Sequence, residues 1–125
     1  MTISDERDTA TLEITVSGST GGSVLVTVEG ELDYDTANDL RTALLDALQR
    51  DPAAVTLDLA GLRFLDSSGL GVIVSGWQRA RAAGIHYVVR RTPSVIAEQF
   101  EMTGLSQVLT FDEHDEAESD GSSAA

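Results

Sequence analysis

Cysteine is absent from this chain of 125 residues, and so is lysine, so that all eight basic residues are arginines. Without thiols the chain has no disulfide, no thiolate zinc site and no cysteine nucleophile. No run approaches the length of about 18 apolar residues that a membrane-spanning helix needs. Residues 1–8 are polar and acidic, unlike a secretory signal peptide. These absences together predict a cytoplasmic protein.

Positive charge is scarce. The chain has 21 acidic residues against 8 basic ones, a formal net charge of −13. A field of that sign repels phosphate backbones and anionic lipid headgroups. We therefore expect no direct nucleic-acid partner and no membrane partner, and we expect instead a protein partner with a basic docking surface.

The chain has the length and composition of one globular domain, with 42% apolar residues. Residues 1–9 are predicted to be a flexible N-terminus, and residues 10–111 are predicted to form the folded domain. Residues 112–125 are acidic and almost free of apolar side chains, which predicts a disordered acidic tail.

Residues 12–16 alternate strictly between apolar and polar side chains, which predicts a strand, and further strands are predicted over residues 24–29, 55–59, 85–89 and 108–111. The glycine-rich turn between the first two strands predicts an antiparallel hairpin. Within the third strand, Asp58 is expected to point to the open face of the sheet or to its edge. In the fourth strand, His86 is expected to face solvent rather than to bind a metal.

Three- and four-residue apolar spacing predicts helices from residue 37 to about 50, from 67 to 82 and from 93 to 103. Asp35 or Thr36 is expected to cap the first helix, Pro93 to stand in the first turn of the third, and Gly84 to end the second. The predicted core stripes are Leu70, Ile73, Val74 and Trp77 in the second helix and Val95, Ile96 and Phe100 in the third. We interpret Trp77 as a core or half-buried aromatic rather than a ligand platform.

The order strand, strand, helix, strand, helix, strand, helix, strand predicts an α/β fold. Parallel strands joined by right-handed crossovers would form a small mixed sheet with the N-terminal hairpin at its antiparallel edge. Because the strands alternate in polarity rather than being apolar throughout, we expect the helices to cover mainly one face.

The stretch Phe64–Val74 lies at the centre of this pattern. Asp66, Ser67 and Ser68 immediately precede helical apolar spacing and are typical of a helix N-terminus. The same position can present a hydroxyl where the helix dipole favours a bound anion, so a serine there can carry a phosphoryl group. The two interpretations are compatible.

Catalytic motifs are missing. Gly-x-Ser-x-Gly, a Walker loop and a dinucleotide-binding glycine motif are all absent, although Gly69 and Gly71 resemble half of the last. Asp33 and Asp66 follow neighbouring strands and are expected to lie near each other. Paired acids suggest metal binding, but loop carboxylates beside helix caps are the more frequent explanation. We assign no catalytic residue, cofactor or metal, and we predict a protein that is not an enzyme.

The sequence contains three further blocks of interest: Gly30–Asp33 with Thr36, Ala37, Leu40 and Arg41; Asp66–Ile73; and Met102–Leu105. Together these blocks resemble the STAS domain family of bacterial anti-sigma factor antagonists. They occur in the family's order and spacing, and the resemblance covers about residues 10–111. It implies a STAS-like fold.

The resemblance also implies a partner-switching function. In the family, the unphosphorylated antagonist binds an anti-sigma factor that is also a serine kinase, and so releases a sigma factor. The kinase phosphorylates the first serine of the motif, here Ser67, with Ser68 as the second candidate, and a PP2C-type phosphatase reverses the modification. The implied partner-binding residues are Asp33, Asp66, Ser67, Ser68 and Gly69.

Two other functions remain open at this stage. STAS-like domains also serve as scaffold subunits of stress-signalling complexes or of lipid-transport systems. A small hydrolase or nucleotide-dependent enzyme has little support from the residues, because no phosphate-binding loop is visible. Physical reasoning favours a local switch over a refolding one, since a phosphoryl group at a helix N-terminus is tolerated by its own chain.

Overall fold

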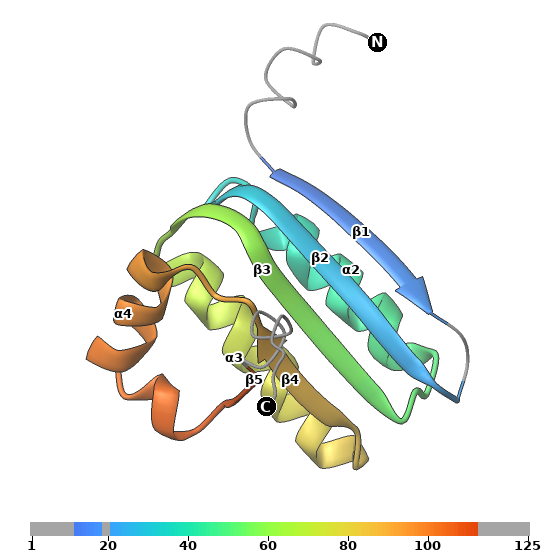
Figure 1. The fold of residues 1–125 in the computed structure, drawn as a ribbon. Helices are drawn as coiled ribbons and strands as arrows, with labels where there is room; N and C mark the ends of the chain where they lie inside the picture. The colour runs from blue at the N-terminus through green and yellow to red at the C-terminus, as the bar shows by residue number, and fades with distance from the viewer. Residues whose placement is uncertain (1–11, 19–20, 113–125) are drawn as a thin grey trace, which may run out of the picture.

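The computed structural model describes residues 12–18 and 21–112, and its elements follow the predicted order. Figure 1 shows them as a single sheet with helices packed against it. The elements are β1 (Leu12–Gly18), β2 (Ser23–Leu32), α2 (Ala37–Gln49), β3 (Ala54–Leu65), α3 (Ser67–Ala83), β4 (His86–Arg90), α4 (Ser94–Met102), the 3-10 turn η1 (Leu105–Gln107) and β5 (Thr110–Asp112). The predicted flexible N-terminus, residues 1–9, and nearly all of the predicted tail lie outside the described residues. Asp112, which was assigned to that tail, is the last residue of β5.

The five strands lie in the order β1-β2-β3-β4-β5. β1 pairs with β2 in antiparallel fashion, with Ile14 opposite Val28, and every other neighbouring pair is parallel. This confirms the predicted mixed sheet with an antiparallel N-terminal edge.

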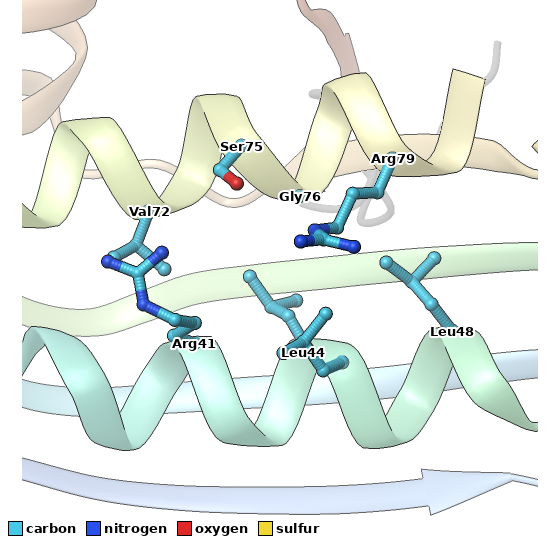
Figure 2. Close-up of a pocket in the computed structure, with 8 residues that line it drawn as sticks. Arg41, Leu44, Leu48, Val72, Ser75, Gly76 and Arg79 are labelled. Atoms are coloured by element: carbon cyan, nitrogen blue, oxygen red, sulfur yellow. The ribbon is translucent and has the colours of Figure 1, made fainter. Parts of the chain in front are cut away.

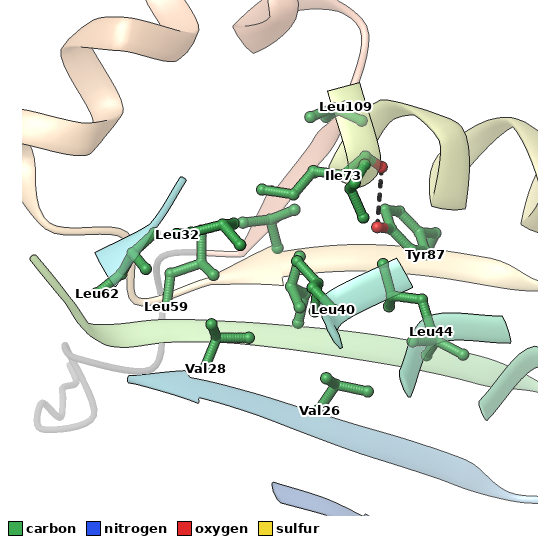
Figure 3. Close-up of a cluster of buried hydrophobic side chains, with 14 of the residues drawn as sticks. Val26, Val28, Leu32, Leu40, Leu44, Leu59, Leu62, Ile73, Tyr87 and Leu109 are labelled. Atoms are coloured by element: carbon green, nitrogen blue, oxygen red, sulfur yellow. Dashed lines mark hydrogen bonds between the residues drawn. The ribbon is translucent and has the colours of Figure 1, made fainter. Parts of the chain in front are cut away.

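Helices α2 and α3 lie side by side on one face of the sheet, behind it in the view of Figure 1, while α4 lies beside the end of β3. The side chains between the sheet and these helices form one core, and Figure 3 shows a part of it. Its fully buried members include Val26, Val28, Leu32, Leu40, Leu44, Leu57, Leu59, Ile73, Ile96 and Phe100. The prediction that the helices cover mainly one face is confirmed.

Strands β2 and β3 continue beyond the predicted ends. The predicted strands end at residues 29 and 59, yet Gly30–Leu32 and residues 60–65 continue the parallel pairing, which ends with Leu32 beside Leu65. Two register shifts interrupt the pairing, and such irregularities break the alternation that identifies a strand from sequence. The extension carries both strands to the start of α3.

The buried stripe of α3 differs from the predicted one. The buried residues are Gly69, Val72, Ile73, Gly76 and Ala80, while Leu70 and Trp77 are only partly buried and pack against the core. The small residues let the helix approach closely, since a Cβ at Gly76 would lie 2.7 Å from the Tyr87 hydroxyl. Sequence periodicity favoured the large apolar side chains and missed the small ones.

Smaller differences concern the termini of the elements. Thr36 is the N-cap of α2, one of the two predicted residues, and Gly84 ends α3 in the left-handed conformation with φ 74°. Pro93 is the N-cap of α4 rather than a residue of its first turn. Val95 was predicted to lie in the core, but 65% of its surface is exposed. β4 starts one residue later than predicted, at the exposed His86, and Thr110 begins β5 two residues late.

Asp58 differs most from expectation. Alternation places its side chain on the face opposite Leu57 and Leu59, as predicted, but it is buried, with 1% of its surface exposed. Two arginines cover it, with Arg91 Nη2 at 2.8 Å and Arg90 Nε at 3.3 Å from its Oδ2. Burial alone would raise the pKa of Asp58, but hydrogen bonds from Arg91 and from the Ala60 N–H, with the two positive charges, hold it below its ordinary value.

Candidate functional site

The candidate site lies where α3 begins, beside the ends of β2 and β3. The last residues of these strands, Leu32 and Leu65, are register partners. The backbone N–H of Asp66 also donates to the carbonyl oxygen of Leu32 at 3.2 Å, so the loops after the two strands are tied together. Asp33 and Asp66, each directly after a paired strand end, therefore belong to adjacent loops, as the sequence predicted.

Asp66 caps α3. Its backbone is extended, with φ −113° and ψ −174°, and its Oδ1 accepts hydrogen bonds from the backbone N–H groups of Ser68 at 2.9 Å and Gly69 at 3.2 Å. These are two of the donors that a helix leaves unpaired at its N-terminus. A negative charge at this end also interacts favourably with the helix dipole.

Asp33 organises the turn that leads into α2. Its Oδ1 accepts hydrogen bonds from the backbone N–H of Asp35 at 3.0 Å, and from the backbone N–H and the hydroxyl of Thr36, both at 3.1 Å. That hydroxyl has one proton, and its alternative acceptor is the carbonyl oxygen of Glu31 at 2.9 Å. Both acids of the site thus shape local backbone, which agrees with the cap explanation weighed against metal binding.

Ser67 is the first residue of α3 and is exposed. Among residues 12–18 and 21–112, none makes a hydrogen bond to its hydroxyl. Ser68 is half-buried, and its backbone N–H is held by Asp66. Of the two serines, Ser67 presents its hydroxyl more openly.

Gly69 supports this surface from beneath. It is buried, and a Cβ at this position would lie 2.6 Å from Leu32 Cγ and 2.8 Å from Leu65 Cδ1. The glycine therefore lets the start of α3 rest directly on the ends of β2 and β3. Its part in any docking surface is indirect, through the position that it gives to the two serines.

A shallow hollow lies beside Ser68, between the starts of α2 and α3. It is lined by Tyr34, Asp35, Ala37, Asn38, Arg41 and Ser68. Tyr34 is 80% exposed although it is aromatic. Neither Tyr34 nor Arg41 had a functional role predicted from the sequence. Tyr34 stands in an acidic turn and outside any periodic apolar pattern, and this position could have indicated an exposed aromatic side chain.

The arrangement suits docking and modification of a hydroxyl better than metal chemistry. No group of three or more histidine or acidic residues in the described part of the chain could hold a metal ion. None of the helices within that part is long and apolar enough to cross a bilayer. An anion on the Ser67 hydroxyl would stand at the positive end of the α3 dipole, an interaction of about 0.3–1 kcal/mol.

Comparisons with known proteins find related sequences and similar folds. A family model described as the STAS domain matches residues 12–117. The anti-sigma F factor antagonist of Paenibacillus polymyxa is 32% identical over 89 residues, which cover 70% of this chain and 76% of that protein.

Solved structures share the fold. An anti-sigma factor antagonist from Mycobacterium paratuberculosis superposes with a TM-score of 0.69 and 25% identity, over 82% of this chain and 86% of that one. The Bacillus cell fate determinant SpoIIAA, solved in its phosphorylated form, superposes with a TM-score of 0.64 and 21% identity, over 84% of this chain and 96% of that one.

Proposed function

The chain belongs to the STAS domain family, and from that premise we propose that it is an anti-sigma factor antagonist. In its unphosphorylated form it binds an anti-sigma factor that is also a serine kinase, and it thereby frees a sigma factor. The kinase inactivates it by phosphorylating Ser67, and a PP2C-type phosphatase restores it. It acts in the cytoplasm as a regulator without catalytic activity of its own.

One observation carries this proposal: the Ser67 hydroxyl is exposed at the N-terminus of α3 while the work of capping is done by its neighbour. Asp66 accepts from the N–H groups of Ser68 and Gly69, so a modified Ser67 leaves the cap in place. Ser68 is the second candidate, but it is half-buried and lines the hollow beside Arg41. The fold therefore tolerates a phosphoryl group at Ser67.

The named relatives support the same function. The Paenibacillus polymyxa and Mycobacterium paratuberculosis proteins are both named as anti-sigma factor antagonists. The SpoIIAA structure with this fold is of a phosphorylated form. For the present chain, Asp33, Asp66, Ser67 and Ser68 form the proposed contact surface, with Gly69 setting its shape.

The energetics favour a switch that acts on the partner rather than on the fold. A phosphoryl group adds about −1.5 to −2 charges at neutral pH. Unpaired or like charges in an interface cost several kcal/mol, whereas a hundredfold loss of affinity needs only about 2.7 kcal/mol. A single modification at Ser67 is therefore sufficient to release the partner while the domain stays folded.

The test is phosphorylation by the cognate anti-sigma factor with ATP, followed by site mapping with mass spectrometry. We expect a single phosphate on Ser67, and none on the Ser67→Ala variant. The Ser68→Ala variant is the matched control and should still be phosphorylated. Phosphate found only at residues other than Ser67 and Ser68 would contradict the proposal.

A further inference from the structure

The groove between α2 and α3 starts at the candidate site and carries two arginines. It is lined by Arg41, Leu44, Leu45, Leu48, Val72, Ser75, Gly76 and Arg79. Figure 2 shows Arg41 from α2 and Arg79 from α3 both reaching into the space between the helices, with Leu44 and Leu48 on the α2 side. Arg41 also lines the hollow that contains Ser68 and Tyr34, so the groove continues from the candidate site.

These two arginines differ from most others in the chain. Arg50 pairs with Asp46, Arg90 and Arg91 pair with Asp58, and Arg81 lies over the Trp77 ring at 5.5 Å. Within the described residues, Arg41 and Arg79 make no ion pair with a carboxylate. No acidic side chain lines the groove, although the whole chain has a formal charge of −13.

This shallow groove therefore combines two partly buried leucines, Leu45 and Leu48, with two guanidinium groups that make no ion pair within the described residues. The charged residues that line this groove are both arginines, whereas the hollow beside Ser68 also contains Asp35. Arginine is well suited to bind a carboxylate in a bidentate manner at an interface. Charge complementarity across an interface mainly determines which partner is accepted.

We propose that the α2–α3 groove receives an acidic segment of the anti-sigma factor, with carboxylates of that segment on Arg41 and Arg79 and apolar side chains on the leucines. This inference rests on the proposed function and extends its contact surface from the start of α3 along the helix pair. The groove then supplies specificity, while Ser67 supplies the switch. It also means that the partner surface is of mixed charge rather than uniformly basic.

Charge reversal tests the groove directly. The wild-type chain and the variants Arg41→Glu, Arg79→Glu and Arg81→Glu are titrated with the purified anti-sigma factor that wild-type chain co-purifies from its host. All three variants change the net charge equally, but Arg81 lies over Trp77 and does not line the groove. We expect Arg41→Glu and Arg79→Glu each to raise the Kd on the order of tenfold or more, and Arg81→Glu to change it by less than about threefold. Circular dichroism confirms that each variant is folded.

A second measurement distinguishes the loss of a specific contact from a general loss of folding. Replacing single acidic residues of the anti-sigma factor by lysine should restore binding to Arg41→Glu or Arg79→Glu for at least one pair. Equal losses for all three chain variants, or loss without any rescue, would overturn the groove proposal while the wild-type affinity still supports the antagonist function.

Other occupants of the groove give different results. If gel filtration shows a wild-type dimer that Arg41→Glu dissociates, the groove belongs to a second copy and the proposal is wrong. If ATP, rather than the protein, shifts the NMR signals of the Arg41 and Arg79 side chains, the occupant is a nucleotide and the proposal is likewise wrong. A wild-type chain that binds no anti-sigma factor would overturn the proposed function itself, and this inference with it.

Discussion

The Asp66 carboxylate accepts a hydrogen bond from the backbone N–H of Ser68 at 2.9 Å, so the residues on either side of Ser67 are joined across it. The hydroxyl between them makes no hydrogen bond to the described part of the chain and is exposed. The structure thus separates two tasks within three consecutive residues. Asp66 stabilises the start of the helix, and Ser67 remains available for modification.

The cap can be tested apart from the charge of Asp66. Asp66→Ala removes the acceptor for two helical N–H groups and should lower the free energy of unfolding by about 1 kcal/mol. Asp66→Asn keeps an acceptor oxygen and should lower the free energy of unfolding by only a few tenths of that amount. Urea unfolding followed by circular dichroism distinguishes them. If binding of the anti-sigma factor falls for Asp66→Asn as well, the carboxylate charge belongs to the contact surface. Equal stability of Asp66→Ala and wild type would contradict the capping role.

The two glycines near the start of α3 provide a matched pair. A Cβ at Gly69 would come within 2.8 Å of both Leu32 and Leu65 side chains, whereas a Cβ at Gly71 meets no atom within 4 Å. Gly69→Ala should therefore destabilise the fold by about 1–3 kcal/mol through overpacking. Gly71→Ala should stabilise it by up to about 1 kcal/mol, because alanine favours the helix. Thermal unfolding of both variants measures the difference, and the same sign for both would contradict this account.

Comparison of these two glycines also shows what sequence reasoning could achieve. The capping sequence and the order of elements were readable, because they depend on local chemistry and on the alternation of strand and helix. The closeness of α3 to the sheet was not, because it depends on the absence of a Cβ at Gly69 and Gly76 facing side chains from distant strands. The periodic pattern of large apolar residues does not reveal close packing that depends on glycine.

The burial of Asp58 on the other face of the sheet also depends on residues that are distant in the sequence. Its direction followed from strand alternation, but its burial depends on Arg90 and Arg91, which lie 32 and 33 residues further along the chain. No local sequence pattern predicts that these two arginines cover Asp58. The ends of β2 and β3 were likewise missed, because the register shifts near Glu29 and Gly30 break the alternation.

The Asp58 cluster predicts a pH dependence of stability. Its pKa is lowered in the folded state, so the folded chain binds this proton less readily than the unfolded chain. The resulting stabilisation is present above the ordinary value of 3.8 and is lost as pH falls below it. Asp58→Asn should reduce stability at pH 7 and flatten the acid limb of the stability curve. Urea titrations between pH 2 and pH 7 check this, and an unchanged acid limb would contradict it.

Tyr87 connects β4 to α3 from within the core. Its hydroxyl donates to the Ile73 carbonyl oxygen at 2.9 Å, and burial raises its pKa, so the neutral form is retained. Tyr87→Phe should cost about 1 kcal/mol of unfolding free energy, because one buried hydrogen bond is lost while the ring remains. Chemical denaturation measures it. A cost near zero would mean that the bond is offset by the desolvation of the hydroxyl.

The most direct test of the central claim is the affinity of the anti-sigma factor for the chain before and after phosphorylation of Ser67, measured by calorimetry. Circular dichroism of both forms reports whether the chain stays folded. We expect at least a hundredfold loss of affinity together with superimposable spectra and a melting temperature within a few degrees. Equal affinity of the two forms, or a phosphorylated chain that unfolds, would contradict a local switch at the start of α3.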